Sequence, residues 1–162
     1  ATPETHSELW RTLTTEFGPD RRRTGAHPDI HFANAFVGNY LRMELLSRYG
    51  LFEQERREIM AFFLDMVDTT GTLWENMNAS ASCNHGFASH VARWILRDIL
   101  GVIRIDQVNR TVTVRAPQVG LDFCEARLPV ADGGFVRTRW QKGSGGVRAE
   151  TEVPAGYRLE QG

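Results

Sequence analysis

The sequence predicts an α+β protein in which helices come first and strands follow. Apolar side chains recur at helical spacing as far as residue 100, and after Gly101 their period changes to two. The two patterns are segregated, which argues against alternating βαβ units. With 162 residues, 41% of them hydrophobic, the chain can form one ordinary domain or two small ones. We expect a helical domain over residues 1–100 and a β domain over residues 101–162.

Four amphipathic helices are expected in the first part. Gly50 and Gly101 follow two of them and can adopt the left-handed conformation that ends a helix. The short connection after Gly50 predicts that the second and third helices form an antiparallel hairpin. The expected helices cover residues 2–17, 32–49, 53–67 and 86–100.

The second part shows the alternation of apolar and polar side chains that is typical of strands. Asn, Asp, Pro and Gly separate the segments, and the glycine-rich residues 141–146 predict a hairpin loop. We expect a small antiparallel sheet or sandwich. The expected strands cover residues 102–105, 111–115, 123–128, 135–140, 147–153 and 157–159.

Charge and composition exclude several classes of partner. The formal net charge is −1, so the chain has no electrostatic basis for binding nucleic acid or an anionic membrane. No apolar run reaches the roughly 18 residues that span a bilayer, and a soluble chain of undetermined compartment is expected. Cys83 and Cys124 fit no metal-ligand spacing and are expected to be unpaired thiols, with no metal or cofactor. The arginines at 21–23 predict a solvated surface turn.

The segment 72–86 contains the densest group of side chains that could do chemistry. It carries Trp74, Glu75 and His85 together with several amides and hydroxyls. Sugar sites use this mixture, because an aromatic ring stacks on a pyranose, polar groups bind its hydroxyls and a carboxylate activates water. The alternative interpretation is structural, with Trp74 in the core, Glu75 on the surface and a polar residue capping the next helix.

Several motifs in this region resemble the carboxy-terminal part of the family 78 α-L-rhamnosidases. Residues 72–75 (TLWE) and 84–96 (NHGFASHVARWIL) are similar to the end of the family's catalytic region. Residues 33–50 (ANAFVGNYLRMELLSRYG) resemble the preceding inner helix, and residues 153–160 (VPAGYRLE) resemble the end of its terminal β-sandwich. The order and spacing of these short motifs carry the resemblance, which covers most of the chain after His31.

The resemblance implies a fold, an activity and roles for two residues. The helices would be the last ones of an (α/α) barrel of six hairpins, followed by a small antiparallel β-sandwich. The activity would be release of terminal α-L-rhamnose from a glycoside or polysaccharide by inversion, which uses two carboxyl groups. Glu75 corresponds to the family's proposed base, and His85 to a histidine that contacts the sugar. The general acid would come from upstream chain, so this chain alone is expected to be inactive and to associate with that part.

Other residues are weaker candidates for the binding site. Under the barrel interpretation His31 and Asn34 open an inner helix and could line the pocket, and Trp74 could form one wall. The alternatives are local capping and packing for the first two and a buried structural indole for Trp74. The acidic candidates within the chain (Asp29, Asp65 and Asp68) are expected to be caps or surface charges.

Two functions without catalysis also fit the sequence. In a carbohydrate-binding module the β domain would present exposed Trp140, Tyr157 and Arg137 to a sugar. In a protein-interaction module the apolar helix faces would be covered by a partner protein. Both keep the fold and remove any catalytic role from Glu75.

Overall fold

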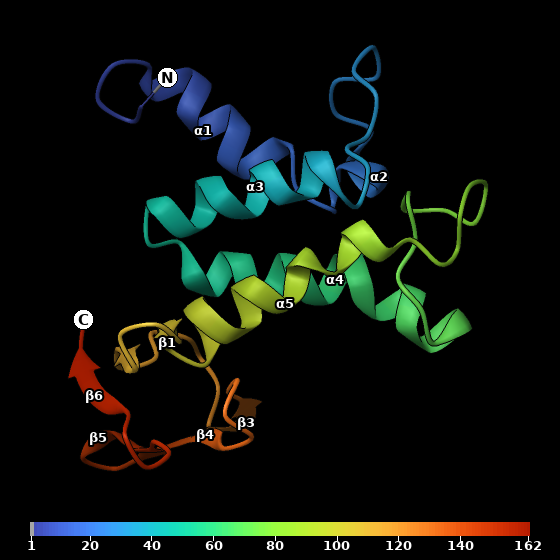
Figure 1. The fold of residues 1–162 in the computed structure, drawn as a ribbon. Helices are drawn as coiled ribbons and strands as arrows, with labels where there is room; N and C mark the ends of the chain where they lie inside the picture. Colours follow the sequence, from blue (N-terminus) through green and yellow to red (C-terminus); the bar gives the residue numbers. More distant parts are fainter. Residues whose placement is uncertain (1) are drawn as a thin grey trace. The chain divides into compact units, whose positions relative to one another are not determined.

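A computed structural model describes residues 2–162 and has helices followed by strands along the chain (Figure 1). The predicted α+β class is therefore confirmed. The chain divides into two compact units, with the boundary in the sequence between His90 and Val91. The domain boundary after residue 100 that the sequence suggests stays a prediction.

The first unit is helical, and its first two long helices start later than the periodicity predicts. Residues 3–5 form a turn, and the second long helix begins at Val37, where the Asn34 side chain accepts hydrogen bonds from the N–H groups of Val37 and Gly38. Gly71, at φ +71°, ends the longest helix. The elements are α1 (Ser7–Glu16), α2 (Arg21–Thr24), α3 (Val37–Arg48), α4 (Phe52–Thr70) and η1 (Gly86–His90).

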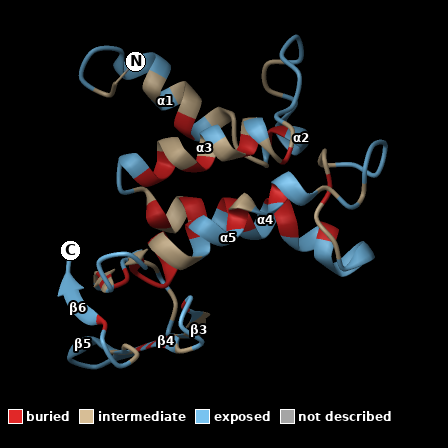
Figure 2. Cartoon of the chain, in the orientation of Figure 1, coloured by how far each residue is buried: buried red, intermediate tan, exposed pale blue. Residues whose placement is uncertain are grey.

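Helix α4 has both buried and exposed positions along its length (Figure 2). Its buried residues include Ile59, Phe62, Phe63 and Met66, at the spacing of a helix face. Met60, Leu64 and Val67 are 45–48% exposed and follow one another at intervals of four and three residues, which also puts them on one face. The helix therefore carries a second apolar stripe that the described chain leaves exposed.

A buried ion pair joins the three long helices of this unit. Arg42 of α3 donates to both carboxylate oxygens of Glu58 of α4, with N–O distances of 2.8 and 2.6 Å. The same guanidinium donates to the carbonyls of Leu13 and Thr14 in the last turn of α1. Carbonyls in the last turn of a helix need donors from outside it, so Arg42 caps α1 and ties it to the hairpin.

Arg21 corrects the interpretation of residues 21–23 as a solvated turn. Its side chain is buried, and its guanidinium donates to the carbonyls of Ala26, His27, Ile30 and His31. The rings of Phe17 and Phe32 also contact it, at 5.0 and 4.8 Å from their centroids. The burial of Arg21 was not predicted because runs of charged residues are usually solvated. No local pattern distinguishes the one arginine of the three that binds the carbonyls of the following loop.

The second unit begins with α5 (Val91–Trp94) and the π-helical turn η2 (Ile95–Ile99). Gly101 then has φ +79°, and a Cβ at this position would collide with the carbonyl oxygen of Arg115, so the predicted glycine stop is also a close approach. Buried Asp98 forms ion pairs with Arg97 and Arg115. Helical structure thus reaches residue 99, close to the predicted end.

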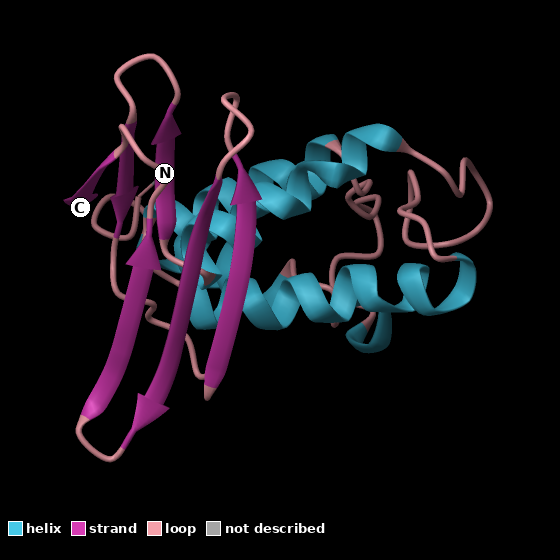
Figure 3. Ribbon diagram, turned by 60° about the horizontal axis from the view of Figure 1, so that its bottom comes forward, coloured by secondary structure: helices cyan, strands magenta, loops and turns pink. Residues whose placement is uncertain are grey.

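Within residues 2–162, six strands form two three-stranded sheets, and Figure 3 shows the strands together with the helices. In one, β3, β4 and β5 are all antiparallel, and only Ser144 and Gly145 separate the last two strands. In the other, β1 pairs antiparallel with β2, but β6 lies parallel to β2, so the expectation of a wholly antiparallel domain is wrong for β6. The strands are β1 (Val102–Asp106), β2 (Thr111–Val114), β3 (Phe123–Pro129), β4 (Phe135–Gly143), β5 (Gly146–Glu152) and β6 (Arg158–Gln161).

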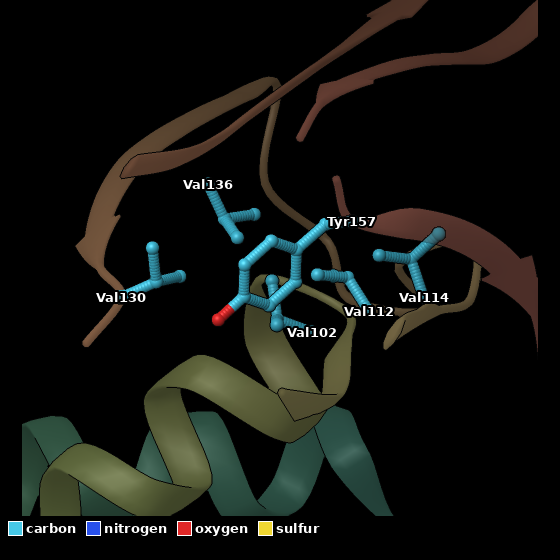
Figure 4. Packing of buried hydrophobic residues seen from close by; sticks show 6 residues of the cluster. All are labelled: Val102, Val112, Val114, Val130, Val136 and Tyr157. Carbon is cyan, nitrogen blue, oxygen red and sulfur yellow. The ribbon is translucent and has the colours of Figure 1, made fainter. Parts of the chain in front are cut away.

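One apolar cluster takes side chains from both sheets (Figure 4). Tyr157 lies among the valines, and its hydroxyl donates to Gln107 over 2.6 Å. Trp140 of β4 is also buried, at 1% exposure. Of the three residues that a sugar-binding β domain would expose, only Arg137 is exposed, and the premise of that alternative is wrong for Trp140 and Tyr157. The cluster comprises Val102, Val112, Val114, Val130, Val136 and Tyr157.

The remaining observations concern the two cysteines, membrane-spanning helices and groups of metal-ligating side chains. Cys83 and Cys124 are both free, as predicted, and burial raises the pKa of the Cys124 thiol. Within residues 2–162 no helix combines the length and apolar character that crossing a membrane requires. The same residues contain no group of three or more His, Cys, Asp or Glu side chains arranged to hold a metal ion.

Candidate functional site

The segment that follows α4 is held by hydrogen bonds between its two ends. The N–H of His85 donates to the carbonyl of Leu73, and the N–H of Glu75 donates to the carbonyl of Ser82, both over 2.8 Å. The Thr72 hydroxyl donates to the carbonyl of Cys83. Residues 72–75 and 82–85 therefore run side by side in opposite directions, and this pairing brings together the parts of the loop that carry Glu75 and His85.

A second segment, the stretch before α3, binds the backbone carbonyl of Glu75. The N–H of Ala35 donates to the carbonyl of Glu75 over 2.7 Å, so the stretch before α3 lies against the loop. Both backbone groups of Glu75 thus have a partner, while its side chain is half-buried. A carboxylate on a backbone fixed in this way can act on a bound molecule without a cost for ordering the loop.

The ring of His85 contacts two aromatic side chains, Phe36 and Phe87, whose rings also lie close to each other, with centroids 6.4 Å apart. Its centroid is 4.8 Å from that of Phe36 and 5.9 Å from that of Phe87. Its Nε2 atom is buried and makes no hydrogen bond within residues 2–162. Burying such a nitrogen without a partner costs free energy, so it is a candidate for a hydrogen bond with a ligand.

His90 completes the support of this region. Its Nε2 lies 2.8 Å from the carbonyl oxygen of Ala35, the residue whose N–H binds Glu75. Burial lowers the pKa of His90, and the hydrogen bond to Ala35 opposes that effect. A carbonyl can only accept, so Nε2 carries the proton and donates. His90 thus holds the stretch before α3 against the loop, and no local pattern in the sequence indicates this link to Glu75 through Ala35.

Trp74 points away from solvent. Its side chain is 4% exposed, its Nε1 donates to the Thr70 hydroxyl over 2.8 Å, and its N–H donates to the sulfur of Met66 over 3.4 Å. These bonds fasten the loop to the end of α4. The burial favours the structural alternative for this indole, and its contact with a sugar stays a prediction.

His31 and Asn34 lie in the stretch before α3. The Asn34 side chain is occupied in capping, as described above, and the His31 side chain is exposed while its carbonyl accepts from Arg21. Ala35, between Asn34 and Phe36, makes the contact with Glu75. The structure therefore brings the backbone of this stretch to the loop, and a sugar-binding role for either side chain stays a prediction.

Sequence reasoning missed Phe36 as a neighbour of His85. The motif 33–50 contains Phe36, but periodicity alone gives it the same meaning as any other apolar helix residue. Ala35 offers no signal at all, because its contribution comes from its backbone. The acidic residues Asp29, Asp65 and Asp68 are all exposed, in agreement with their expected role as surface charges.

The arrangement defines a class of site: a half-buried carboxylate and an aromatic-flanked imidazole on a loop between helices, in a chain of α+β fold. No family model and no curated protein matches this sequence. Among solved structures, the chain is similar to the crystal structure of a GH78 family rhamnosidase of Bacillus sp. GL1, with a TM-score of 0.72 and 20% identity. The match covers 96% of this chain and 17% of that one, so this chain has the fold of a part of the rhamnosidase.

Proposed function

We propose that this chain is the carboxy-terminal part of a glycoside hydrolase that releases terminal α-L-rhamnose with inversion. The observation that carries the proposal is the fold likeness to a GH78 rhamnosidase along 96% of the chain. The loop geometry adds support, because residues 72–75 and 82–85 pair and bring the Glu75 and His85 segments together. In this proposal residues 1–100 are the last helices of an (α/α) barrel of six hairpins, and residues 101–162 are a terminal β-sandwich.

Glu75 is the general base of the proposed reaction. Its carboxylate takes a proton from a water molecule, whose oxygen attacks the anomeric carbon as the bond to the leaving group breaks. A second carboxyl group, on upstream chain, protonates the leaving oxygen from the opposite side of the sugar. Such pairs lie roughly 6.5–9.5 Å apart, which leaves room for the water. His85 binds a sugar hydroxyl through its buried Nε2, and Trp74, His31 and Asn34 complete the binding region.

The missing amino-terminal part is also the proposed partner of the exposed helix faces. Met60, Leu64 and Val67 of α4 form an apolar stripe, and Val37 and Leu41 of α3 are 54% and 60% exposed. Further barrel helices would cover such surfaces, since apolar side chains at helical spacing are usually packed. The 17% coverage of the rhamnosidase is consistent with a longer protein of this kind.

The activity test uses the longer protein that carries this chain, with 4-nitrophenyl α-L-rhamnoside as substrate. We expect release of nitrophenol, and proton NMR at early times should show β-L-rhamnose as the first product, because inversion converts the α configuration to β. A first product of α configuration would exclude the inverting mechanism. A complete longer protein without activity on α-L-rhamnosides would exclude the substrate.

His85 is expected to contribute to sugar binding more than to the chemical step. His85→Ala in the active protein should raise KM, with a smaller effect on kcat, because a hydrogen bond to the bound sugar is lost. A hydrogen bond between neutral groups contributes about 0.5–1.5 kcal/mol, so kcat/KM should fall by a corresponding amount. His85→Gln, which retains a hydrogen-bonding amide, is the matched control and should recover part of the loss. An unchanged KM in His85→Ala would contradict the role.

A protein-interaction module is the second candidate, and the apolar stripe on α4 is the observation that favours it. The coding sequence upstream of residue 1 separates the two. Several hundred further in-frame residues with helical hairpins and an acidic loop would support the hydrolase. A start codon directly before residue 1 would support the interaction module, because no barrel would then form.

A further inference from the structure

The helical unit contains a small cavity that the proposed reaction does not use. It has a volume of about 150 Å³ and lies among the end of α1, the stretch before α3, and helices α3 and α4. Glu75 and His85 do not line it. Its wall includes three phenylalanine rings and several polar side chains, among them Phe17, Phe32, Phe62, Arg21, His31 and Asn39.

Asn39 makes this cavity unusual. Its side chain is 3% exposed, and its Oδ1 is buried with no hydrogen-bond partner within residues 2–162. An amide oxygen buried without a donor costs about 1–3 kcal/mol. The neighbouring polar groups do not relieve it, because Arg42 and Glu58, which also line the cavity, bind each other. A ligand with a hydrogen-bond donor would therefore satisfy Asn39 Oδ1.

Arg21 supplies the complementary donor. Its hydrogen bonds occupy Nε, both N–H groups of Nη2 and one N–H of Nη1, and the bond from Nη1 to the His31 carbonyl is long, at 3.4 Å. The second N–H of Nη1 has no acceptor among the described residues. A hydroxyl group can donate to Asn39 and accept from Arg21, whereas an ammonium would have only donors and a carboxylate only acceptors.

The remaining walls indicate the shape of the ligand. Phenylalanine rings favour the apolar face of a ring that carries hydroxyl groups on its edge. The exposed side chains of His31 and Phe32, the latter 51% exposed, mark the solvent side of the cavity. The volume corresponds to roughly five water molecules at about 30 Å³ each, which is also the scale of one small ring with its substituents.

We infer that this cavity is a second ligand site, which binds one neutral monosaccharide ring through Asn39 and Arg21. Neither Glu75 nor His85 lines this cavity, although Met77 of the same loop does, and the inference does not depend on Glu75 being a base. A sugar hydroxyl donates to Asn39 Oδ1 and accepts from Arg21 Nη1, and the ring stacks against phenylalanine. No covalent step is involved.

The test is an NMR titration of the 162-residue chain with L-rhamnose, using ¹⁵N-labelled protein. Saturable shifts of the Asn39 side-chain amide and of the backbone amides of residues 31–33 are expected. In Asn39→Leu, which has a similar size but no amide, the affinity at these signals should fall at least about tenfold. The unfolding midpoint of this variant should be unchanged or higher, because the unpaired oxygen is gone.

Two further variants keep the test decisive. Phe32→Ala removes an exposed ring without disturbing the buried core and should also weaken the binding at residues 31–33. Glu75→Gln and His85→Ala should leave those shifts unchanged, whatever they do to the signals of residues 72–85. If the shifts grow linearly without saturation, or if Asn39→Leu retains the binding, the cavity holds water only and the inference is wrong.

Discussion

Replacement of Glu75 by Gln is expected to lower kcat on an α-L-rhamnoside by about 10²–10⁴-fold in the longer protein. The amide cannot take a proton from water, but it has nearly the same size and can still accept one hydrogen bond. Because both backbone groups of Glu75 are held by Ala35 and Ser82, the loop should keep its position in the variant. Steady-state kinetics should therefore show a large fall in kcat and a small change in KM. Glu8→Gln, at an exposed position of α1, is the control and should leave both constants unchanged.

Chemical rescue separates a general base from a residue that only supports the site. Azide is already an anion, so it can attack the anomeric carbon without losing a proton, and a missing base no longer matters. In Glu75→Ala, which also opens space, azide should restore turnover and yield β-L-rhamnosyl azide as the inverted product. Normal turnover in Glu75→Gln would exclude the role, and a Glu75→Ala variant that azide does not rescue would argue that Glu75 acts on folding or binding.

The sequence predicted the elements well where one physical signal dominates. Each strand begins within one residue of its expected start. Both the alternation of apolar and polar side chains and the turn residues between segments indicate where the strands lie. The predicted starts of the first two long helices were less accurate. Pro3 and the apolar residues after 32 continue the periodic pattern, but α3 begins only at Val37, whose N–H donates to the Asn34 side chain. The parallel pairing of β6 could not be predicted, because alternation gives the faces of a strand but not its neighbour.

The sequence indicates which side chains could carry the chemistry of the candidate site, but not which residues hold them in place. Glu75 and His85 stand out because a carboxylate and an imidazole share one loop with an indole. Ala35 and His90 could not be found, since the first acts through its backbone and the second through a contact 55 residues away. Arg21 and Asn39 were missed for a related reason: their burial comes from tertiary packing, which no local pattern reports.

The largest effect on stability is expected from breaking the Arg42–Glu58 pair. Its side chains are only 11% and 10% exposed, and Arg42→Met would leave the Glu58 carboxylate in a buried position with Gln54 as its remaining donor. The carbonyls of Leu13 and Thr14 would lose their bonds from Arg42 as well, although Gln54 still donates to Thr14. Removing one partner of a buried pair typically costs about 3–5 kcal/mol, because the other charge is left unpaired. Urea unfolding followed by far-ultraviolet circular dichroism, which reports mainly the helical unit, should show the loss.

Two comparisons identify the cause of that loss. Arg48→Met removes an arginine of the same helix whose pair with Glu44 is exposed on the arginine side, and its unfolding midpoint should stay close to that of the native chain. Arg42→Met combined with Glu58→Leu should be more stable than Arg42→Met alone, because no charge then remains buried. If Arg42→Met and Arg48→Met have equal midpoints, the pair does not hold α1 to the hairpin. If the double variant is less stable than Arg42→Met, the loss comes from packing and capping and not from an unpaired charge.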